Sequence, residues 1–169
     1  VCARGRDALD TVRDEIAAHG VTAFAEACDV GEGEALYRFL TAARAALGGC
    51  DVLVNNTSGF GLSDDDAGWQ AGFDVDVMGA VRATRTVTPW MAEAGGGAIV
   101  HVSSISALET GSPPAYTAAK AALVAHSKTM AKALAPQGIR VNCVAPGSIE
   151  FPGGMWQQVR DSDDPSLYR

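Results

Sequence analysis

The sequence predicts an α/β fold in which a mostly parallel sheet is covered by helices. Segments with helical spacing alternate with short apolar segments along the chain, which favours successive βαβ units. Residues 51–54 form a short apolar run that ends in two asparagines, and this is typical of a strand buried on both faces. Residues 98–102 and 139–144 have the same apolar character and follow helical segments.

The individual elements follow from apolar spacing and from the residues that stop helices. Residues 6–18 have helical spacing and end before Gly20, which is expected to cap the helix. Pro89 lies inside a long helical stretch and predicts a kink or a local break. No regular structure is expected from residue 150 onward. The expected elements are a strand end at 1–3, helix 6–18, strand 21–28, helix 32–47, strand 51–54, helix 67–94, strand 98–102, helix 116–134 and strand 139–144.

Length and composition indicate one domain over residues 1–169. The net charge of −7, without a basic stripe, argues against nucleic-acid binding. No apolar run reaches the roughly 20 residues of a membrane span, and no signal peptide opens the sequence. The cysteines are scattered and are expected to be buried free thiols, so the predicted location is the cytoplasm. The histidines share no ligand spacing, and no metal site is predicted.

Tyr116 and Lys120 form the most informative motif. A spacing of four places both side chains on one face of a helix. An ammonium held close to a phenol favours the phenolate, so Tyr116 is the expected proton donor and acceptor. A serine hydroxyl from the pair Ser103 and Ser104 would hold a substrate oxygen beside it. This arrangement predicts hydride chemistry at a carbonyl or alcohol.

These motifs together resemble the short-chain dehydrogenase/reductase family. Asn55-Asn56, Ser103-Ser104, Tyr116-x3-Lys120 and Pro146-Gly147 occur in the order and at the approximate intervals of that family. The resemblance implies a doubly wound, Rossmann-like sheet and a catalytic set of Ser104, Tyr116 and Lys120. The motif pattern selects Ser104, the second serine of the pair. The usual interval of about thirteen residues selects Ser103, so that alternative stays open.

The resemblance also implies a nicotinamide cofactor and a small carbonyl or alcohol substrate. No acidic residue ends the strand at residues 1–3, which corresponds to the second strand of the family, where an enzyme using NAD usually has one, whereas Arg4 suits a 2′-phosphate. NADP is therefore expected in preference to NAD. The residues that the resemblance assigns to cofactor binding are Arg4, Asp29, Val30, Asn56, Tyr116, Lys120, Pro146, Gly147 and Ile149.

Three features depart from the family pattern. Asp76 stands where the family has an asparagine, and Gly59 is displaced by one place in the loop after Asn56. The glycine-rich dinucleotide fingerprint is absent, which indicates a fragment that lacks the first strand. That strand would lie between residues 1–3 and 51–54, so a gap is expected there.

Other functions are also compatible with the residues. A non-catalytic relative could act as an interaction module through its alanine-rich helix, and a sugar-nucleotide epimerase can share the tyrosine and lysine motif. The resemblance further implies a homo-oligomer, either a dimer or a tetramer.

Overall fold

The structure, a computed structural model, describes residues 1–162. No regular structure was predicted from residue 150 onward, and residues 163–169 of that segment lie outside the described residues. In chain order the elements are β1 (Cys2–Ala3), α1 (Arg6–Ala17), β2 (Glu26–Ala27), α2 (Gly33–Leu47), β3 (Val52–Asn55), α3 (Asp66–Ala71), the π-helix η1 (Gly72–Met78), α4 (Gly79–Glu93), β4 (Gly97–Val102), the 3-10 helix η2 (Ile105–Ala107), α5 (Pro114–Leu134), the 3-10 helix η3 (Ala135–Gln137), β5 (Ile139–Val144) and α6 (Met155–Arg160).

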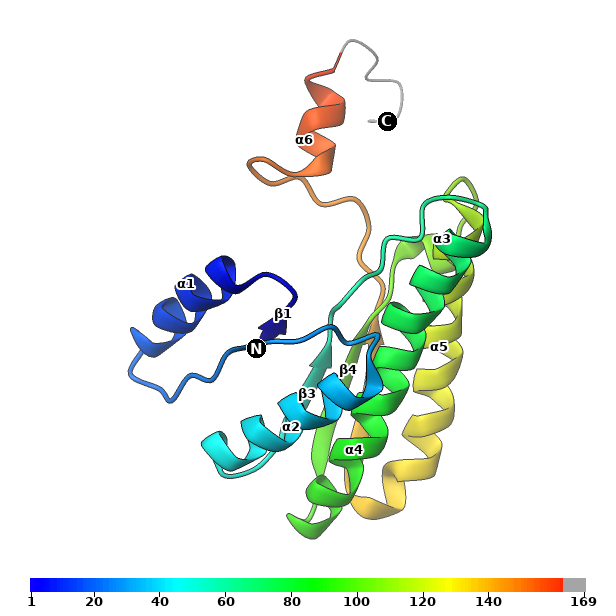
Figure 1. Ribbon diagram of the computed structural model, residues 1–169. Helices are drawn as coiled ribbons and strands as arrows, with labels where there is room; N and C mark the ends of the chain where they lie inside the picture. Colours follow the sequence, from blue (N-terminus) through cyan, green and yellow to red (C-terminus); the bar gives the residue numbers. More distant parts are fainter. Residues whose placement is uncertain (163–169) are drawn as a thin grey trace.

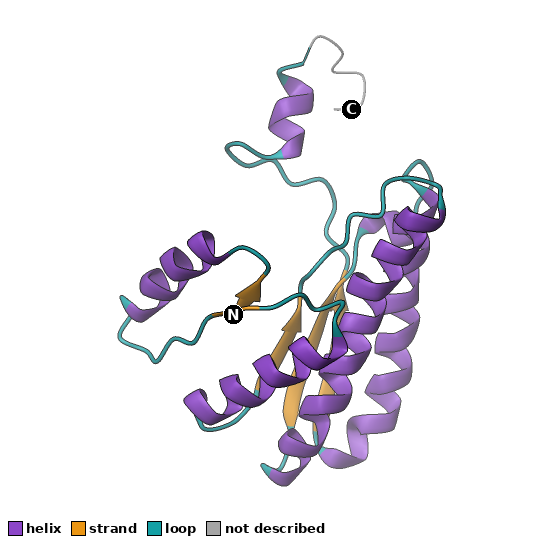
Figure 2. Ribbon diagram, in the orientation of Figure 1, coloured by secondary structure: helices purple, strands orange, loops and turns teal. Residues whose placement is uncertain are grey.

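The strands are parallel and form two sheets. β1 pairs with β2, while β4 lies between β3 and β5 in a three-stranded sheet. Helices α4 and α5 run side by side along the three-stranded sheet, as Figures 1 and 2 show. The α/β class with a parallel sheet is therefore confirmed.

The core lies between the three-stranded sheet and the helices α2, α4 and α5. Met91, Val87 and Ile99 are fully buried there, and Phe39 of α2 stacks on Phe24. Burial of side chains of this size supplies about 1.5–3 kcal/mol each. This core fixes the carboxyl ends of β3, β4 and β5 at one edge of the sheet, where parallel α/β proteins bind ligands.

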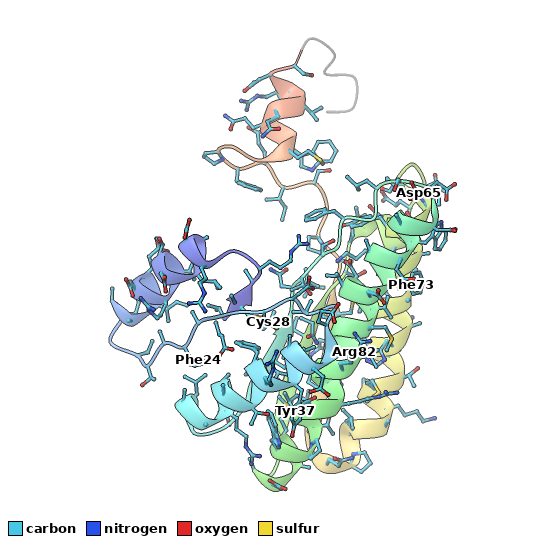
Figure 3. The ribbon with its side chains drawn as sticks, in the orientation of Figure 1. Phe24, Cys28, Tyr37, Asp65, Phe73 and Arg82 are labelled. Carbon is cyan, nitrogen blue, oxygen red and sulfur yellow. The ribbon has the colours of Figure 1, made fainter. Side chains whose placement is uncertain are left out.

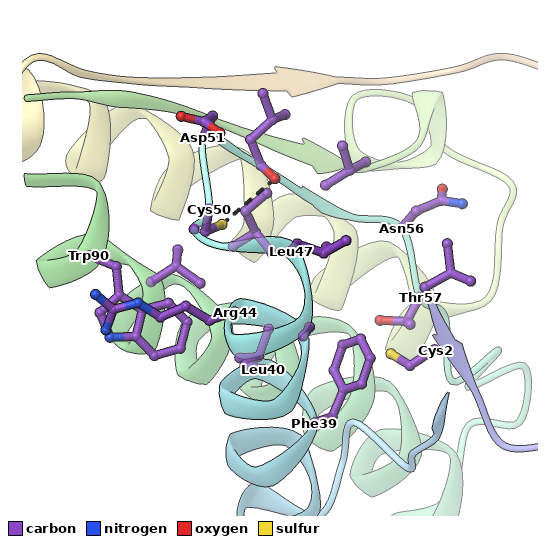
Figure 4. Close-up of a pocket in the computed structure, with 17 residues that line it drawn as sticks. Cys2, Phe39, Leu40, Arg44, Leu47, Cys50, Asp51, Asn56, Thr57 and Trp90 are labelled. Carbon is purple, nitrogen blue, oxygen red and sulfur yellow. Dashed lines mark hydrogen bonds between the residues drawn. The ribbon is translucent and has the colours of Figure 1, made fainter. Parts of the chain in front are cut away.

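A gap separates the two sheets, as the sequence predicted. β1 and β3 share no hydrogen bonds, and a cavity of about 730 Å³ lies between them (Figure 4). Cys2 and Leu40 contribute to its lining, together with Asn56 at the end of β3. The expectation that residues 51–54 are buried on both faces is wrong, because Val52 and Val54 are 60% and 56% exposed.

Four other expectations need correction. The strand predicted over 21–28 shrinks to β2, because only Glu26 and Ala27 are in register with residues of β1. The chain is helical again in α6, where no regular structure was expected. A local break at Pro89 does not occur, because α4 continues through it to Glu93.

The fourth correction concerns the thiols. All cysteines are free, but only Cys28 is buried. Burial raises the pKa of the Cys28 thiol to about 11, so this thiol is protonated and a poor nucleophile at neutral pH.

No helix within residues 1–162 combines the length and the apolar character needed to cross a membrane.

Candidate active site

Helix α5 carries Tyr116 and Lys120 one turn apart at its N-terminal end. Pro114 begins the helix, a position where its missing N–H costs nothing. The ammonium of Lys120 lies 5.6 Å from the centre of the Tyr116 ring. The two side chains are therefore brought together on one helix face as the sequence predicted. Among residues 1–162, no protein group forms a hydrogen bond with the Tyr116 hydroxyl.

Lys120 is also held in a buried ion pair with Asp76. Its Nζ lies 2.7 Å from Oδ1 of Asp76, and the two side chains are 4% and 1% exposed. The same Nζ donates to the backbone oxygen of Val102 at 3.3 Å. The contact with Oδ1 is a close ion pair rather than an aligned hydrogen bond. The aspartate thus faces the lysine directly, which the sequence alone did not establish.

Asp76 lies in the π-helix η1, between α3 and α4. Its second oxygen, Oδ2, accepts a hydrogen bond of 2.6 Å from the backbone N–H of Gly59. A Cβ at Gly59 would collide with the carbonyl oxygen of Ala71, so the loop after β3 lies directly on the helix. Asp76 therefore links this loop to α5. Isolated π turns of this kind occur frequently at functional sites.

The two serines after β4 have different surroundings. Ser103 is 4% exposed and donates its hydroxyl proton to the backbone oxygen of Lys120 at 2.8 Å. Ser104 is half-buried, and its Oγ accepts from the backbone N–H of Ser106 and donates to the Ser106 hydroxyl, each at 3.1 Å. Ser103 is thus engaged in packing β4 against α5, whereas Ser104 caps the short helix η2 at the more open position.

Four of the predicted cofactor residues line one cavity of about 290 Å³ at the carboxyl ends of β1, β2 and β3. They are Arg4, Asp29, Val30 and Asn56. Asp29 Oδ1 accepts from the backbone N–H of Gly31, and Arg82 of α4 donates to the Gly31 oxygen, which fixes the turn after β2. Figure 3 shows Arg82 on α4 and Cys28 at the end of β2. A guanidinium, a carboxylate and an apolar wall in one cavity fit the adenosine end of a dinucleotide.

Three further predicted cofactor residues, Pro146, Gly147 and Ile149, follow β5. The oxygen of Pro146 accepts from the backbone N–H of Ile105, which ties this turn to the end of β4 beside the serines. Gly147 and Ile149 are exposed. The structure therefore gathers the predicted residues around the carboxyl ends of the strands, with Tyr116 and Lys120 on α5. Within residues 1–162, no cluster of three or more metal-ligating side chains occurs.

A pair of histidines, of which His101 is buried and His126 half-buried, lies next to this site. His101 of β4 is fully buried, and the Asn55 side-chain amide lies 3.1 Å from its Nδ1. The amide nitrogen can only donate, so Nδ1 accepts and the ring proton is assigned to Nε2. Burial, with a smaller contribution from His126, lowers the pKa of His101 to about 4. The two rings lie edge to face, 5.3 Å apart.

The protein is expected to lose stability in acid because of His101. Its folded-state pKa is below the ordinary value of 6.5, so below pH 6.5 only the unfolded chain takes up the proton readily. The free energy of unfolding should therefore fall by about 2 kcal/mol between pH 7.5 and pH 5 through this group. Urea unfolding of wild type and His101→Gln at both pH values checks this. The exposed His19, replaced by glutamine, is the control and should leave the pH dependence unchanged.

Comparison with known proteins decides the family. The profile described as short chain dehydrogenase matches residues 1–164. The chain belongs to the short-chain dehydrogenase family. Dehydrogenase/reductase SDR family member 4 of Homo sapiens is 34% identical over 165 residues, which cover 92% of this chain and 59% of that protein. The 3-oxoacyl-[acyl-carrier-protein] reductase FabG of Staphylococcus epidermidis is 34% identical over 155 residues, covering 87% and 62%.

Solved structures of short-chain dehydrogenases have the same fold. L-sorbose reductase from Gluconobacter frateurii, in complex with NADPH and L-sorbose, matches with a TM-score of 0.83 and 34% identity. The match covers 96% of this chain and 65% of that one. A 7 alpha-hydroxysteroid dehydrogenase, complexed with NADH and 7-oxo glycochenodeoxycholic acid, has a TM-score of 0.82 and 33% identity, covering 87% and 59%. The chain thus spans about 60% of the length of several short-chain dehydrogenase relatives.

Sequence reasoning missed the role of Gly59 as a donor to Asp76. The displaced glycine was visible in the sequence, but the contact joins residues 17 positions apart. Only the π turn brings Asp76 under the loop, and a π turn has no sequence signature comparable to a helix cap.

Proposed function

We propose that the protein is an oxidoreductase that transfers a hydride between NADP(H) and a carbonyl or secondary alcohol. The observation that carries the proposal is the pair Tyr116 and Lys120, held 5.6 Å apart between ring centre and ammonium beside the carboxyl end of β4. A phenol beside a buried ammonium is suited to proton transfer at a substrate oxygen.

Three side chains, those of Tyr116, Lys120 and Ser104, have a defined part in this proposal. In the reductive direction, the Tyr116 hydroxyl gives its proton to the substrate oxygen, and the Lys120 ammonium stabilises the phenolate that remains. The Ser104 hydroxyl donates a hydrogen bond to the same oxygen and polarises the carbonyl. A bound nicotinamide ring would supply the hydride to the carbonyl carbon, which balances the proton from Tyr116. The oxidative direction reverses these transfers.

The preference for NADP rests on Arg4. It follows β1 directly, is exposed, and lines the same cavity as Asp29 and Val30. The end of β1 carries no carboxylate to accept a ribose 2′-hydroxyl, whereas a guanidinium can bind a 2′-phosphate through two parallel hydrogen bonds. Homo-oligomer formation and a cytoplasmic location remain predictions.

Replacing each of the two serines in turn tests the proposed function. Ser104→Ala in the natural protein should lower kcat about 10²–10³-fold, because the substrate oxygen loses a donor that strengthens in the transition state. Ser103→Ala should mainly lower stability, since its hydroxyl bonds the Lys120 carbonyl. Steady-state kinetics with secondary alcohols and NADP, together with urea unfolding, separate these effects. A larger loss of kcat in Ser103→Ala would reverse the assignment.

The alternative is a non-catalytic interaction module. Isothermal titration with NADPH distinguishes the two, because a module of that kind should bind no nicotinamide cofactor. Absence of binding to the natural protein would overturn the proposed function.

A further inference from the structure

The ion pair between Asp76 and Lys120 combines two unit charges in a buried place. With side-chain exposures of 1% and 4%, neither charge is screened by solvent. The elements around the pair carry other charged or titratable groups, namely Asp66 of α3, Asp74 of η1, Arg82, Arg85 and Glu93 of α4, His101 of β4 and Arg140 of β5. Within residues 1–162, none of these forms an ion pair with either partner. Toward more distant groups the pair therefore carries a net charge of zero, while the ammonium still faces the Tyr116 ring at 5.6 Å.

The pair is also fixed in place from both ends. Oδ2 of Asp76 accepts from Gly59 N–H, and Lys120 Nζ donates to Val102 O. An asparagine at position 76 could accept the same Gly59 bond through its side-chain oxygen, because the amide and the carboxylate have nearly the same shape. The loop thus requires an acceptor at position 76 but does not require a negative charge. The negative charge of the Asp76 carboxylate therefore acts on Lys120 and not on the loop.

We propose that Asp76 is a positioning residue that cancels the charge of Lys120 and thereby sets the preference of the site between oxidised and reduced cofactor. This inference rests on the proposed function, in which Lys120 lies beside the nicotinamide end of the dinucleotide. The oxidised nicotinamide ring carries a positive charge and the reduced ring is neutral. A lone buried ammonium would repel the oxidised form selectively, whereas the neutral pair does not.

Removing the charge of Asp76 should therefore change the two affinities unequally. In Asp76→Asn, the ratio of Kd for NADP⁺ to Kd for NADPH should rise on the order of tenfold. This is the effect of one unit charge acting over ~10 Å at an effective dielectric constant of ~20. Isothermal titration of the natural protein and the variant measures both constants without any turnover.

A double-mutant cycle of the two charges separates the effect on the ratio of Kd values from loss of folding. Lys120→Gln leaves a net charge of −1 and should lower the same ratio. The double variant Asp76→Asn/Lys120→Gln is neutral and should return the ratio to the wild-type value. If Asp76→Asn fails to fold because it leaves Lys120 unpaired, the comparison of Lys120→Gln with the double variant still measures the effect of the Asp76 charge.

Asp74→Asn is the matched control on the same element. It removes the same charge, but the Asp74 carboxylate bonds Gln70 and not Lys120. Any change in affinity that Asp74→Asn causes should be equal for NADP⁺ and NADPH. An unchanged ratio in Asp76→Asn, with both forms bound, would overturn the inference alone. Failure of the wild type to bind either form would overturn the proposed function and the inference with it.

Discussion

Replacing Tyr116 with phenylalanine is expected to lower kcat about 10²–10⁴-fold in the natural protein, while binding of NADPH largely survives. The substitution removes only the hydroxyl, which is the proposed proton donor. Within the described residues that hydroxyl bonds no protein group, so its loss should leave the stability of the fold unchanged. The aromatic ring stays in place against the Lys120 ammonium.

Steady-state kinetics in both directions, with thermal unfolding and isothermal titration, check this expectation. Tyr37→Phe is the matched control, because Tyr37 is 56% exposed on α2 (Figure 3) and lies outside the proposed catalytic set. It should keep the wild-type rate. Retention of that rate by Tyr116→Phe as well would refute the acid–base assignment.

Gly59→Ala should have the largest effect on stability among the site residues. The added methyl group would collide with the backbone carbonyl of Ala71, and backbone atoms within a helix cannot move aside cheaply. Overpacking of this kind costs about 1–3 kcal/mol. The loop would also lift from η1, so the Gly59 hydrogen bond to Asp76 would be lost and NADPH affinity should fall.

Urea unfolding and NADPH titration of the natural protein measure both effects. Gly49→Ala is the control, since Gly49 is also half-buried but has no atom within 4 Å of the added carbon. It should leave stability and affinity unchanged. Equal stability of the two variants would show that the loop does not depend on close contact with the helix.

The parts of the fold that could be predicted are those with local signals. Gly20 adopts a positive φ of 78° close after α1, although the C-cap itself is Ala18, and the spacing of Tyr116 and Lys120 did place both on one face of α5. These outcomes depend on backbone sterics and helix period, which act over a few residues.

The parts that could not be predicted depend on distant contacts. Residues 21–25 have strand-like side chains, yet only Glu26 and Ala27 are in register with β1. Val52 and Val54 are apolar, but their exposure is decided by the gap between the sheets. The ion pair of Asp76 with Lys120 likewise joins residues far apart in the sequence, and no local pattern reports such a contact.

The π turn of η1 makes the site sensitive to chain length as well as to residue identity. A π turn holds one residue more than the α turn it replaces, so deleting one residue from Gly72–Met78 would close the segment to α-helix and shift the side chains within it. The carboxylate at position 76 would then face a different neighbour, and its contacts with Gly59 and Lys120 would be lost. A single-codon deletion in this segment should consequently abolish the proposed activity even though every proposed catalytic side chain is retained.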